Sequence, residues 1–468
     1  MEKENNDMTN KISEIHKSVG IRDSDNGYKQ TEVGVIPSDW KVVSLGDVFS
    51  FSGGFSASRD QLSNDGFCYL HYGDIHKSNK TFIDVKREYS DIPKLNIPIR
   101  AISRKSLLDD GDVVFVDASE DDEGASRHIV IQNPDCLSYI SGLHTIVSKS
   151  KDETIDKKFR QYCFQTLSVK RQFLYFAVGT KVTGISKTNI ARIQIPLPPT
   201  LAEQERIATA LSDVDRLIAS LEKLIAKKRN IKQGAMQELL TGKKRLPGYG
   251  NINGKPVGYK KTEVGVIPED WESKQLGELF EITSSKRVFQ SEWKMEGIPF
   301  YRARELAVLG DRDTINNALF ISKEMYVEYR NKYGVPLVGD MLVTGVGTLG
   351  KTFVVRDGRE FYFKDGNIIW FKLSGIVNPN FLEQLYLTKV ITKQIEDGSA
   401  GTTVGTYTIS GARKTTIPFP SLTEQIAIAQ ILSDMDAEIE QLEQKLSKCK
   451  FIKQGMMQEL LTGKIRLA

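Results

Sequence analysis

The sequence carries the same plan twice. The segment TEVGVIPSDW at residues 31–40 returns as TEVGVIPEDW at residues 262–271, with nine of ten positions identical. A second segment, IKQGAMQELLTGK at residues 231–243, returns as IKQGMMQELLTGK at residues 452–464. Between these repeated segments, residues 49–194 and 280–416 share little beyond scattered glycines. We therefore expect two related halves, each with a constant frame around a divergent insert.

The length and composition fit a large soluble protein. The 468 residues correspond to about two to four domains, and 40% hydrophobic with 26% charged residues is typical of globular chains. A net charge of +4 excludes a protein that coats DNA by charge alone, but it allows local basic surfaces. The sequence has no apolar run of about 18 residues and no signal-like start, so we expect a cytoplasmic protein without a membrane partner.

Cysteine and histidine limit the chemistry that both halves could share. Cys68, Cys136, Cys163 and Cys449 lie too far apart for a zinc-binding motif, so no metal site is predicted. All five histidines lie in the first third of the chain, so a reaction common to both halves cannot depend on them. No catalytic residue is predicted, although one sequence leaves a Ser-His-Asp or paired-carboxylate site open.

Each half is predicted to end in a long helix. Thr200 and Glu203, and likewise Ser421 and Glu424, have the spacing of a capping box, in which the hydroxyl and the carboxylate each bind a backbone amide. From residue 200 to residue 240 such a helix would measure about 60 Å at 1.5 Å per residue. It is too long to be covered by one domain.

An apolar stripe predicts how these helices pack. The stripe residues recur at three- and four-residue steps, and those expected to pack are Ile207, Leu211, Val214, Leu217, Leu221, Leu224, Ile428, Leu432, Met435, Ile439, Leu442 and Leu446; the stripe also includes Ile218, Ile225, Ile231 and Ile452. Antiparallel pairing as a coiled coil would bury both stripes and place the inserts at opposite ends, whereas the alternative is that each helix covers only its own domain. Gly234 and Gly455, inside the helices, predict either close backbone approach or a bend.

One segment matches a nucleotide-binding motif. GVGTLGKT at residues 345–352 fits the phosphate-loop pattern, which requires a helix directly after the loop. Residues 353–363, FVVRDGREFYF, instead predict a β-hairpin turning at Asp357 and Gly358, which argues against an ATP site. Asn378, in NPNF, lacks the second proline of an adenine methyltransferase motif and is predicted to start a helix.

Two polar and basic segments could contact nucleic acid. Residues 179–192 and 401–414 are rich in Gly, Thr, Ser, Asn and Lys, which can donate to phosphates and base edges, although any solvated loop looks similar. The candidate DNA-binding residues of both halves are Arg127, Lys181, Thr183, Ser186, Lys187, Asn189, Thr344, Thr348, Lys351, Thr402, Thr403, Tyr407 and Arg413.

Taken together, these motifs resemble the specificity subunit of type I restriction-modification enzymes. The resemblance covers residues 28–468 and rests on the paired GVIPxDW segments, on IPLPPTLAEQ at residues 195–204 with IPFPSLTEQ at residues 417–425, and on the QELLTGKxRL endings. The Gly-Asp pair at Gly339 and Asp340, followed by a Thr/Gly/Lys loop, also resembles the family's target-recognition domain. The acidic stretch from Glu120 to Glu123 departs from that loop.

The resemblance implies a fold and a role. It implies an α+β fold in which two mixed α/β target-recognition domains are separated by two long antiparallel helices. Each domain would read one half of an asymmetric bipartite site in double-stranded DNA, and the helices would set the spacer and help dock two methyltransferase subunits. Restriction subunits would join them, and S-adenosylmethionine, ATP and Mg²⁺ would belong to these partners because the specificity chain is non-catalytic.

The same comparison sets the expected domain boundaries. They are a mobile polar tail at 1–27, a first recognition domain at 28–196, a spacer helix at 197–246, a linker at 247–258, a second recognition domain at 259–418 and a second spacer helix at 419–468. Two other functions remain open at this point. One is a coiled-coil adaptor that binds proteins without reading DNA, and the other is a phosphate-loop NTPase through residues 345–352.

Overall fold

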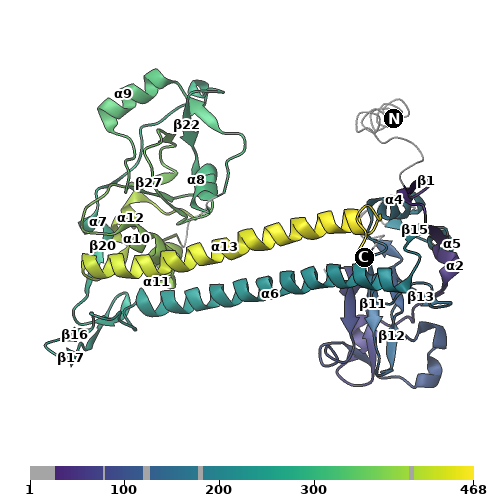
Figure 1. Ribbon diagram of the computed structural model, residues 1–468. Coiled ribbons are helices and arrows are strands. Elements are labelled where there is room, and N and C mark those ends of the chain that lie inside the picture. The colour runs from purple at the N-terminus through teal and green to yellow at the C-terminus, as the bar shows by residue number, and fades with distance from the viewer. Residues whose placement is uncertain are drawn as a thin grey trace. The chain divides into compact units, whose positions relative to one another are not determined.

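The computed structural model describes residues 27–467 except residues 77, 79, 120–126, 178–182, 312 and 400–404. The expected tail therefore lies almost wholly outside the described residues. The chain forms two compact units (Figure 1), one from residues 1–220 with 446–468 and the other from residues 221–445. The long helices α6 (Leu201–Leu239) and α13 (Leu422–Leu460) each contribute a segment to both units. Each unit thus combines parts of both sequence halves.

Unit 1 is built on two sheets. The five-stranded sheet has the order β4 (Phe49–Gly53), β13 (Thr145–Ser150), β9 (Val113–Val116), β11 (His128–Gln132), β7 (Phe82–Asp84). The four-stranded sheet has the order β12 (Tyr139–Ser141), β6 (Phe67–Leu70), β8 (Lys94–Leu95), β5 (Leu62–Ser63). All four residues of β9 are buried because the strand has neighbours on both sides and packed faces.

Short elements connect these sheets to the long helices. Three two-stranded pairs join β1 (Tyr28–Thr31) to β2 (Gly34–Pro37), β3 (Lys41–Ser44) to β15 (Gln194–Leu197), and β10 (Ala118–Ser119) to β14 (Thr183–Gly184). The short helices are α2 (Leu45–Val48), α3 (Tyr72–His76), α4 (Leu167–Phe176) and α5 (Lys187–Ala191). The segment after β15 leads directly into α6.

Unit 2 repeats this plan with shorter sheets. The orders are β21 (Ile282–Thr283), β27 (Ile368–Phe371), β24 (Met341–Thr344), β25 (Thr352–Val354) and β23 (Leu319–Ile321), β22 (Ile298–Tyr301), β26 (Tyr362–Phe363). The two-stranded pairs are β16 (Asn251–Ile252) with β17 (Lys255–Pro256), β18 (Tyr259–Thr262) with β19 (Gly265–Pro268), and β20 (Glu272–Gln275) with β28 (Thr416–Phe419). The helices are α7 (Leu276–Leu279), α8 (Ala303–Gly310), α9 (Lys323–Tyr333), α10 (Pro379–Tyr386), α11 (Lys389–Ser399) and α12 (Ile409–Lys414).

Strand pairing confirms the duplication and corrects one prediction. The central strand β9 is antiparallel to β13 and β11, and β24 is antiparallel to β27 and β25 in the same way. The hairpin predicted for residues 353–363 is wrong, because β25 pairs with β24 whereas β26 runs parallel to β22. Two adjacent β-rich runs joined by Asp and Gly look like a hairpin locally, but tertiary contacts give each strand a more distant partner.

Within each unit, the segments of α6 and α13 pair antiparallel, as predicted. In unit 1, Lys453 of α13 lies 2.6 Å from Asp215 of α6, and in unit 2, Lys232 of α6 lies 2.7 Å from Asp436 of α13. Since Lys232 and Lys453 occupy the same repeat position, as do Asp215 and Asp436, the two ion pairs are the same contact with the helices exchanged. Both units therefore use one helix register.

The predicted capping boxes are half right. The backbone amide of Glu203 donates to the Thr200 hydroxyl over 3.2 Å, and that of Glu424 donates to the Ser421 hydroxyl over 3.3 Å. The carboxylates do not bind the cap amides; they bind Arg466 and Arg245 instead. A guanidinium is charged and can donate two hydrogen bonds to one carboxylate. It therefore binds a buried carboxylate more strongly than a neutral backbone amide does.

The apolar stripe is buried or half-buried at most of the positions that are expected to pack. Ile207, Leu211 and Leu221 on α6 and Ile428, Leu432 and Ile439 on α13 are buried, while Val214, Met435, Leu442 and Leu446 are half-buried. Leu217 and Leu224 are 43% and 38% exposed, so the prediction that they pack is wrong. Ile225 of the stripe is buried, whereas Ile231 and Ile452 are 47% and 44% exposed, so the stripe is not covered at these two positions either.

The helix-interior glycines do not mark a close approach of two backbones. A Cβ atom built on Gly234 or on Gly455 would meet no heavy atom within 4 Å. Gly242 and Gly463, just after the helices, differ because their φ angles are +69° and +70°, and a Cβ there would lie 2.5 Å from Pro268 and Pro37 respectively. The glycines that follow the helices therefore pack closely against these prolines, whereas the glycines inside the helices face open space.

Candidate nucleic-acid interface

The ends of the central strands bring the predicted segments together. In unit 1, the Ile185 amide donates to the Asp117 carbonyl over 2.8 Å, and the Asp117 amide donates to the His144 carbonyl over 3.2 Å. The loop after β9 and the segment before α5 therefore meet at the start of β13. We call this place the recognition edge of unit 1, defined by Asp117, His144 and Ile185.

Unit 2 has the same edge with different side chains. The Tyr407 amide donates to the Gly345 carbonyl over 2.9 Å, and the Gly345 amide donates to the Asn367 carbonyl over 2.8 Å. Gly345, Asn367 and Tyr407 thus define the recognition edge of unit 2. The backbone bonds are repeated while the residue types change from unit to unit, which is the arrangement expected of variable binding loops on a constant scaffold.

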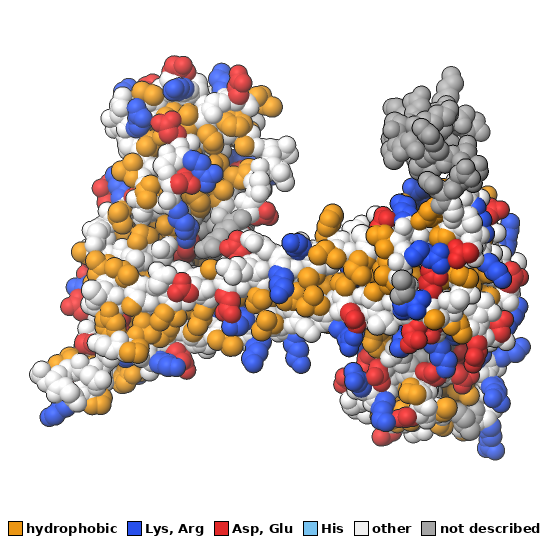
Figure 2. Space-filling view, viewed as in Figure 1, with side chains coloured by type: hydrophobic (Ala, Val, Ile, Leu, Met, Phe, Trp, Pro, Cys, Tyr) orange, Lys and Arg blue, Asp and Glu red, His pale blue; other side chains and the backbone are white. Residues whose placement is uncertain are grey.

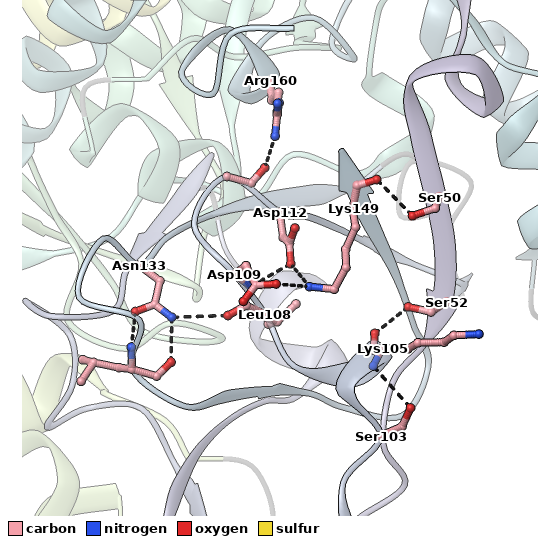
Figure 3. Close-up of polar contacts among 12 residues, drawn as sticks. Ser50, Ser52, Ser103, Lys105, Leu108, Asp109, Asp112, Asn133, Lys149 and Arg160 are labelled. Carbon is pink, nitrogen blue, oxygen red and sulfur yellow. Dashed lines mark hydrogen bonds and ion pairs between the residues drawn. The ribbon is translucent and has the colours of Figure 1, made fainter. Parts of the chain in front are cut away.

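A polar turn anchors the central strand behind each edge. Gly111 has a φ angle of +87°, and the next residue, Asp112, accepts from the Asp109 amide over 2.8 Å and from the Lys149 ammonium over 2.7 Å (Figure 3). In unit 2, Gly339 has a φ angle of +95°, and Asp340 accepts from the Leu337 amide over 2.9 Å. The Gly-Asp pair is therefore a structural turn in both units.

The charges in this turn are satisfied within the fold. Burial raises the pKa of Asp112 above its ordinary value, although the hydrogen bond from Lys149 opposes that shift. Partial burial disfavours the charged form of Lys149, but its hydrogen bonds to Asp109 and Asp112 outweigh this effect and raise its pKa. Figure 3 shows Asn133 and Arg160 making further bonds to backbone oxygens around the same turn. These bonds tie the turn before β9 to β13 and to the segment after β11.

In unit 1, the candidate DNA-binding residues have mixed surroundings. Lys187 is exposed, while Ser186 caps α5 by accepting from the Asn189 amide over 3.1 Å, and Asn189 donates to the Phe176 carbonyl. Arg127 is half-buried and donates to the His76 carbonyl. Thr183 lies in β14, opposite Ser119. Lys181 and the acidic stretch of residues 120–123 lie outside the described residues.

In unit 2, two candidates are buried. Thr344 is 1% exposed, and its hydroxyl accepts from the Lys351 amide over 3.0 Å. Tyr407 is 5% exposed, and its hydroxyl lies 3.1 Å from that of Tyr386 and 2.9 Å from that of Thr415. Buried hydroxyls that already have partners offer no surface to a nucleic acid, which corrects the expectation for these two residues.

The other candidates of unit 2 are accessible where the structure describes them. Thr348 is exposed, and Arg413 is exposed with one guanidinium nitrogen donating to the Ile282 carbonyl over 2.8 Å. Lys351 is half-buried, and its ammonium lies 2.5 Å from Asp311. Thr402 and Thr403 lie outside the described residues.

The structure contradicts the phosphate-loop motif. Residues 345–351 follow β24, as the motif requires, but they lead into strand β25 where a helix would have to begin. Asn378 starts a helix, as predicted, because its side chain accepts from the Phe381 amide over 3.0 Å at the N-terminus of α10. In the part of the chain that the structure describes, no group of three or more His, Cys, Asp or Glu side chains is arranged to hold a metal ion. No helix among the described residues is long and apolar enough to cross a membrane.

Sequence reasoning missed one ion cluster that occurs in both units. In unit 2, Arg245 binds Asp270 at 2.8 Å and Glu424 at 2.7 Å, with its guanidinium 5.4 Å from the centre of the Trp271 ring. In unit 1, Arg466 binds Asp39 and Glu203 and lies 5.9 Å from the Trp40 ring centre. The sequence contains the residues of this cluster in its repeated motifs, because each of three motifs contributes at least one of them. The motifs are separated in the sequence, however, and the sequence alone does not show that they come together in the fold.

The chain is similar to proteins of one known family. The family model for the "Type I restriction modification DNA specificity domain" matches residues 37–230 and 268–449. A protein of Methanocaldococcus jannaschii, provisionally named as the MjaX specificity subunit of a type I restriction enzyme, is 28% identical and aligns over 95% of this chain and 97% of its own. The MjaVIII specificity subunit of the same organism is 29% identical over 65% of this chain and 70% of its own.

Solved structures share the fold. The S subunit of a type I restriction-modification system from M. genitalium has a TM-score of 0.54 at 16% identity, covering 90% of this chain and 96% of its own. A chain from a study of complex assembly and conformational transition of the type I R-M system has a TM-score of 0.50 at 16% identity, covering 92% of this chain and 99% of its own.

Proposed function

Because the chain belongs to the family of type I restriction-modification DNA specificity domains, we propose that each of its units reads one half of an asymmetric bipartite site in double-stranded DNA. The observation that carries this proposal is the pair of recognition edges. Asp117, His144 and Ile185 in unit 1 occupy the backbone positions that Gly345, Asn367 and Tyr407 occupy in unit 2. One scaffold with two different sets of side chains is suited to two half-sites of different sequence.

The repeated frame is suited to docking two copies of one partner. Ile231 and Ile452 occupy equivalent positions and are 47% and 44% exposed, and the neighbouring Gly234 and Gly455 have open space above them. Hydrophobic side chains are visible on the surface along both long helices in Figure 2. Exposed apolar residues that recur identically favour an interface used twice. In this proposal the interface binds two methyltransferase subunits, which restriction subunits then join.

We assign the chemistry to these partners. The titratable cluster behind the edge of unit 1 is bonded within the fold, and the Thr344 and Tyr407 hydroxyls of unit 2 are buried. S-adenosylmethionine, ATP and Mg²⁺ would accordingly bind to the methyltransferase and restriction subunits, and the complex would act in the cytoplasm. The role of this chain is then to choose the DNA sequence and to hold two half-site readers together.

The test is to identify the modified sequence. The full chain is co-expressed with a type I methyltransferase subunit in cells that lack other adenine methylation, and methylated adenines are mapped across the genome. The expected result is one motif with two unlike halves separated by a fixed gap of unspecified bases. Absence of sequence-selective DNA binding, with retention of the protein partner, would instead support the coiled-coil adaptor.

A further inference from the structure

The outward face of α4 in unit 1 is unusual for a soluble protein. Helix α4 is anchored by Val169 and Phe173, which are fully buried. Its opposite face carries Leu167, Lys170, Arg171, Leu174 and Tyr175, all exposed and spaced at three- and four-residue steps. Tyr175 is 82% exposed and Leu167 is 61% exposed. We call these five residues the α4 face.

The cations of this face have no acidic partner in the part of unit 1 that the structure describes. No carboxylate among the described residues lies within ion-pair distance of Lys170, Arg171 or the neighbouring Arg192, whereas Lys149, Lys157 and Arg466 of the same unit are paired. The Arg192 guanidinium lies 4.9 Å from the centre of the Phe176 ring, and that ring centre is 5.2 Å from the Tyr175 ring centre. Unpaired cations thus alternate with exposed aromatic and apolar groups.

Unit 2 contains a matched helix that has exposed lysines, Lys389 and Lys393, but lacks the exposed apolar and aromatic residues of the α4 face. Gln172 of α4 bonds the Gln194 backbone at 2.9 and 2.8 Å, and Gln394 of α11 bonds the Thr416 backbone in the same way at 2.8 and 2.8 Å. The two helices therefore occupy equivalent places in their units. In α11, Glu396 and Asp397 stand where α4 has Leu174 and Tyr175.

This difference indicates the kind of partner. A protein that docks once on each half of the repeated frame would need the same surface in both units, and the α4 face is not repeated. The DNA is the partner that differs between the halves. Continuity supports the same choice, because Asn189 of α5 donates to the carbonyl of Phe176 at the end of α4 over 3.1 Å and so joins this helix to the segment that forms the recognition edge.

We propose that the α4 face binds the phosphate backbone of duplex DNA beside the half-site read by unit 1, an inference that rests on the proposed function. Lys170 and Arg171 neutralise phosphates, and Leu174 and Tyr175 pack against the deoxyribose edge. Such contacts fix the position of the duplex and carry no base information. Because these contacts are electrostatic, the binding that they contribute weakens as the salt concentration rises.

The experiment compares matched charge changes in the two helices. Lys170→Gln/Arg171→Gln is made on α4 and Lys389→Gln/Lys393→Gln on α11, each in the full chain co-purified with its methyltransferase subunit. Fluorescence anisotropy then measures the binding of a duplex selected by the wild-type complex from a random pool, over a range of salt concentrations. Thermal unfolding checks that both variants fold.

The α4 variant should bind roughly tenfold more weakly, and the slope of log affinity against log salt should fall by about 2, because about 0.9 is lost per phosphate contact. Its preference for the selected site over a scrambled duplex should not change, and the α11 variant should show a smaller shift in slope. An unchanged slope in the α4 variant overturns the inference, as does loss of the methyltransferase subunit with unchanged DNA binding. If the wild-type complex itself selects no sequence, the proposed function fails instead.

Discussion

Arg466 donates to the Glu203 carboxylate from two guanidinium nitrogens, and its Nη2 atom lies 2.8 Å from the Oε2 atom of Glu203. The two residues are 263 positions apart in the sequence. The same guanidinium binds Asp39 at 3.0 and 3.1 Å. One side chain thus joins the segment after α13, the start of α6 and the segment before β3 in unit 1. Arg245 makes the equivalent contacts in unit 2 with Glu424 and Asp270.

Removing these arginines should destabilise the two units unequally. Arg245 is 10% exposed and Glu424 is 2% exposed, so Arg245→Met leaves a buried carboxylate without its cation, with the Trp271 indole as its remaining side-chain partner among the described residues, and should cost about 3 kcal/mol. Arg466 and Asp39 are 39% and 51% exposed, so solvent screens their interaction; although the other partner of Arg466, Glu203, is 5% exposed, Arg466→Met should cost less because the guanidinium itself is more solvated than that of Arg245. Urea unfolding measures the loss of stability in each variant, and hydrogen exchange shows in which unit the loss occurs. Equal losses in both variants would contradict this account.

The same clusters predict acid sensitivity. The hydrogen bond from Arg466 lowers the pKa of Asp39 below its ordinary value of 3.8, and the hydrogen bond from Arg245 lowers the pKa of Asp270 in the same way. A carboxylate whose pKa is lowered by folding stabilises the fold above the unfolded pKa, and this stabilisation is lost as the pH falls through the folded pKa. Stability should therefore decrease below about pH 4.

Asparagine variants isolate this contribution. Asp39→Asn and Asp270→Asn should lower stability at pH 7 and should flatten its dependence on pH below about 4, as measured by urea unfolding at a series of pH values. Asp213→Asn, at an exposed position outside both clusters, is the control. A pH dependence equal to that of the wild type in both cluster variants would show that these carboxylates do not carry the effect.

Much of the architecture could be predicted from the sequence because it depends on local patterns and on repetition. Matching segments at two places predicted two equivalent halves, and a three- to four-residue apolar period predicted α6 and α13. Their antiparallel pairing followed from the need to cover a stripe too long for one domain. Such features survive in the folded chain because they are decided by residues close together in sequence.

The misses depend on contacts between distant residues. Residues 353–363 look like a hairpin, but the partners of β25 and β26 come from elsewhere in unit 2. Thr344 and Tyr407 have side chains suited to DNA, yet both are buried, and the Tyr407 hydroxyl lies beside those of Tyr386 and Thr415, which are distant contacts that the sequence does not show. Glu203 and Glu424 sit where a capping box would have them, but the arginines that take them are far away in sequence or in another motif.

The two kinds of glycine should respond oppositely to alanine. A Cβ at Gly234 or Gly455 meets open space within a helix, so Gly234→Ala and Gly455→Ala should each stabilise the isolated chain by up to about 1 kcal/mol. Gly242→Ala should destabilise it, because the φ angle is +69° and the Cβ would lie 2.5 Å from Pro268. Thermal unfolding checks the sign of each change. Destabilisation by both helix-interior variants would mean that the space above them is not open.

Exchange of one insert should change one half of the DNA site. If residues 49–194 are replaced by the corresponding insert of another family member, the frame residues Asp39, Glu203 and Arg466 remain, so the new insert should be held in the same way. Methylation mapping should then show a new sequence in one half-site, with the other half and the gap unchanged. The matched exchange of residues 280–416 should alter only the opposite half. A single exchange that altered both halves would contradict independent reading by the two units, because it would require the bases contacted by one edge to depend on the side chains of the other.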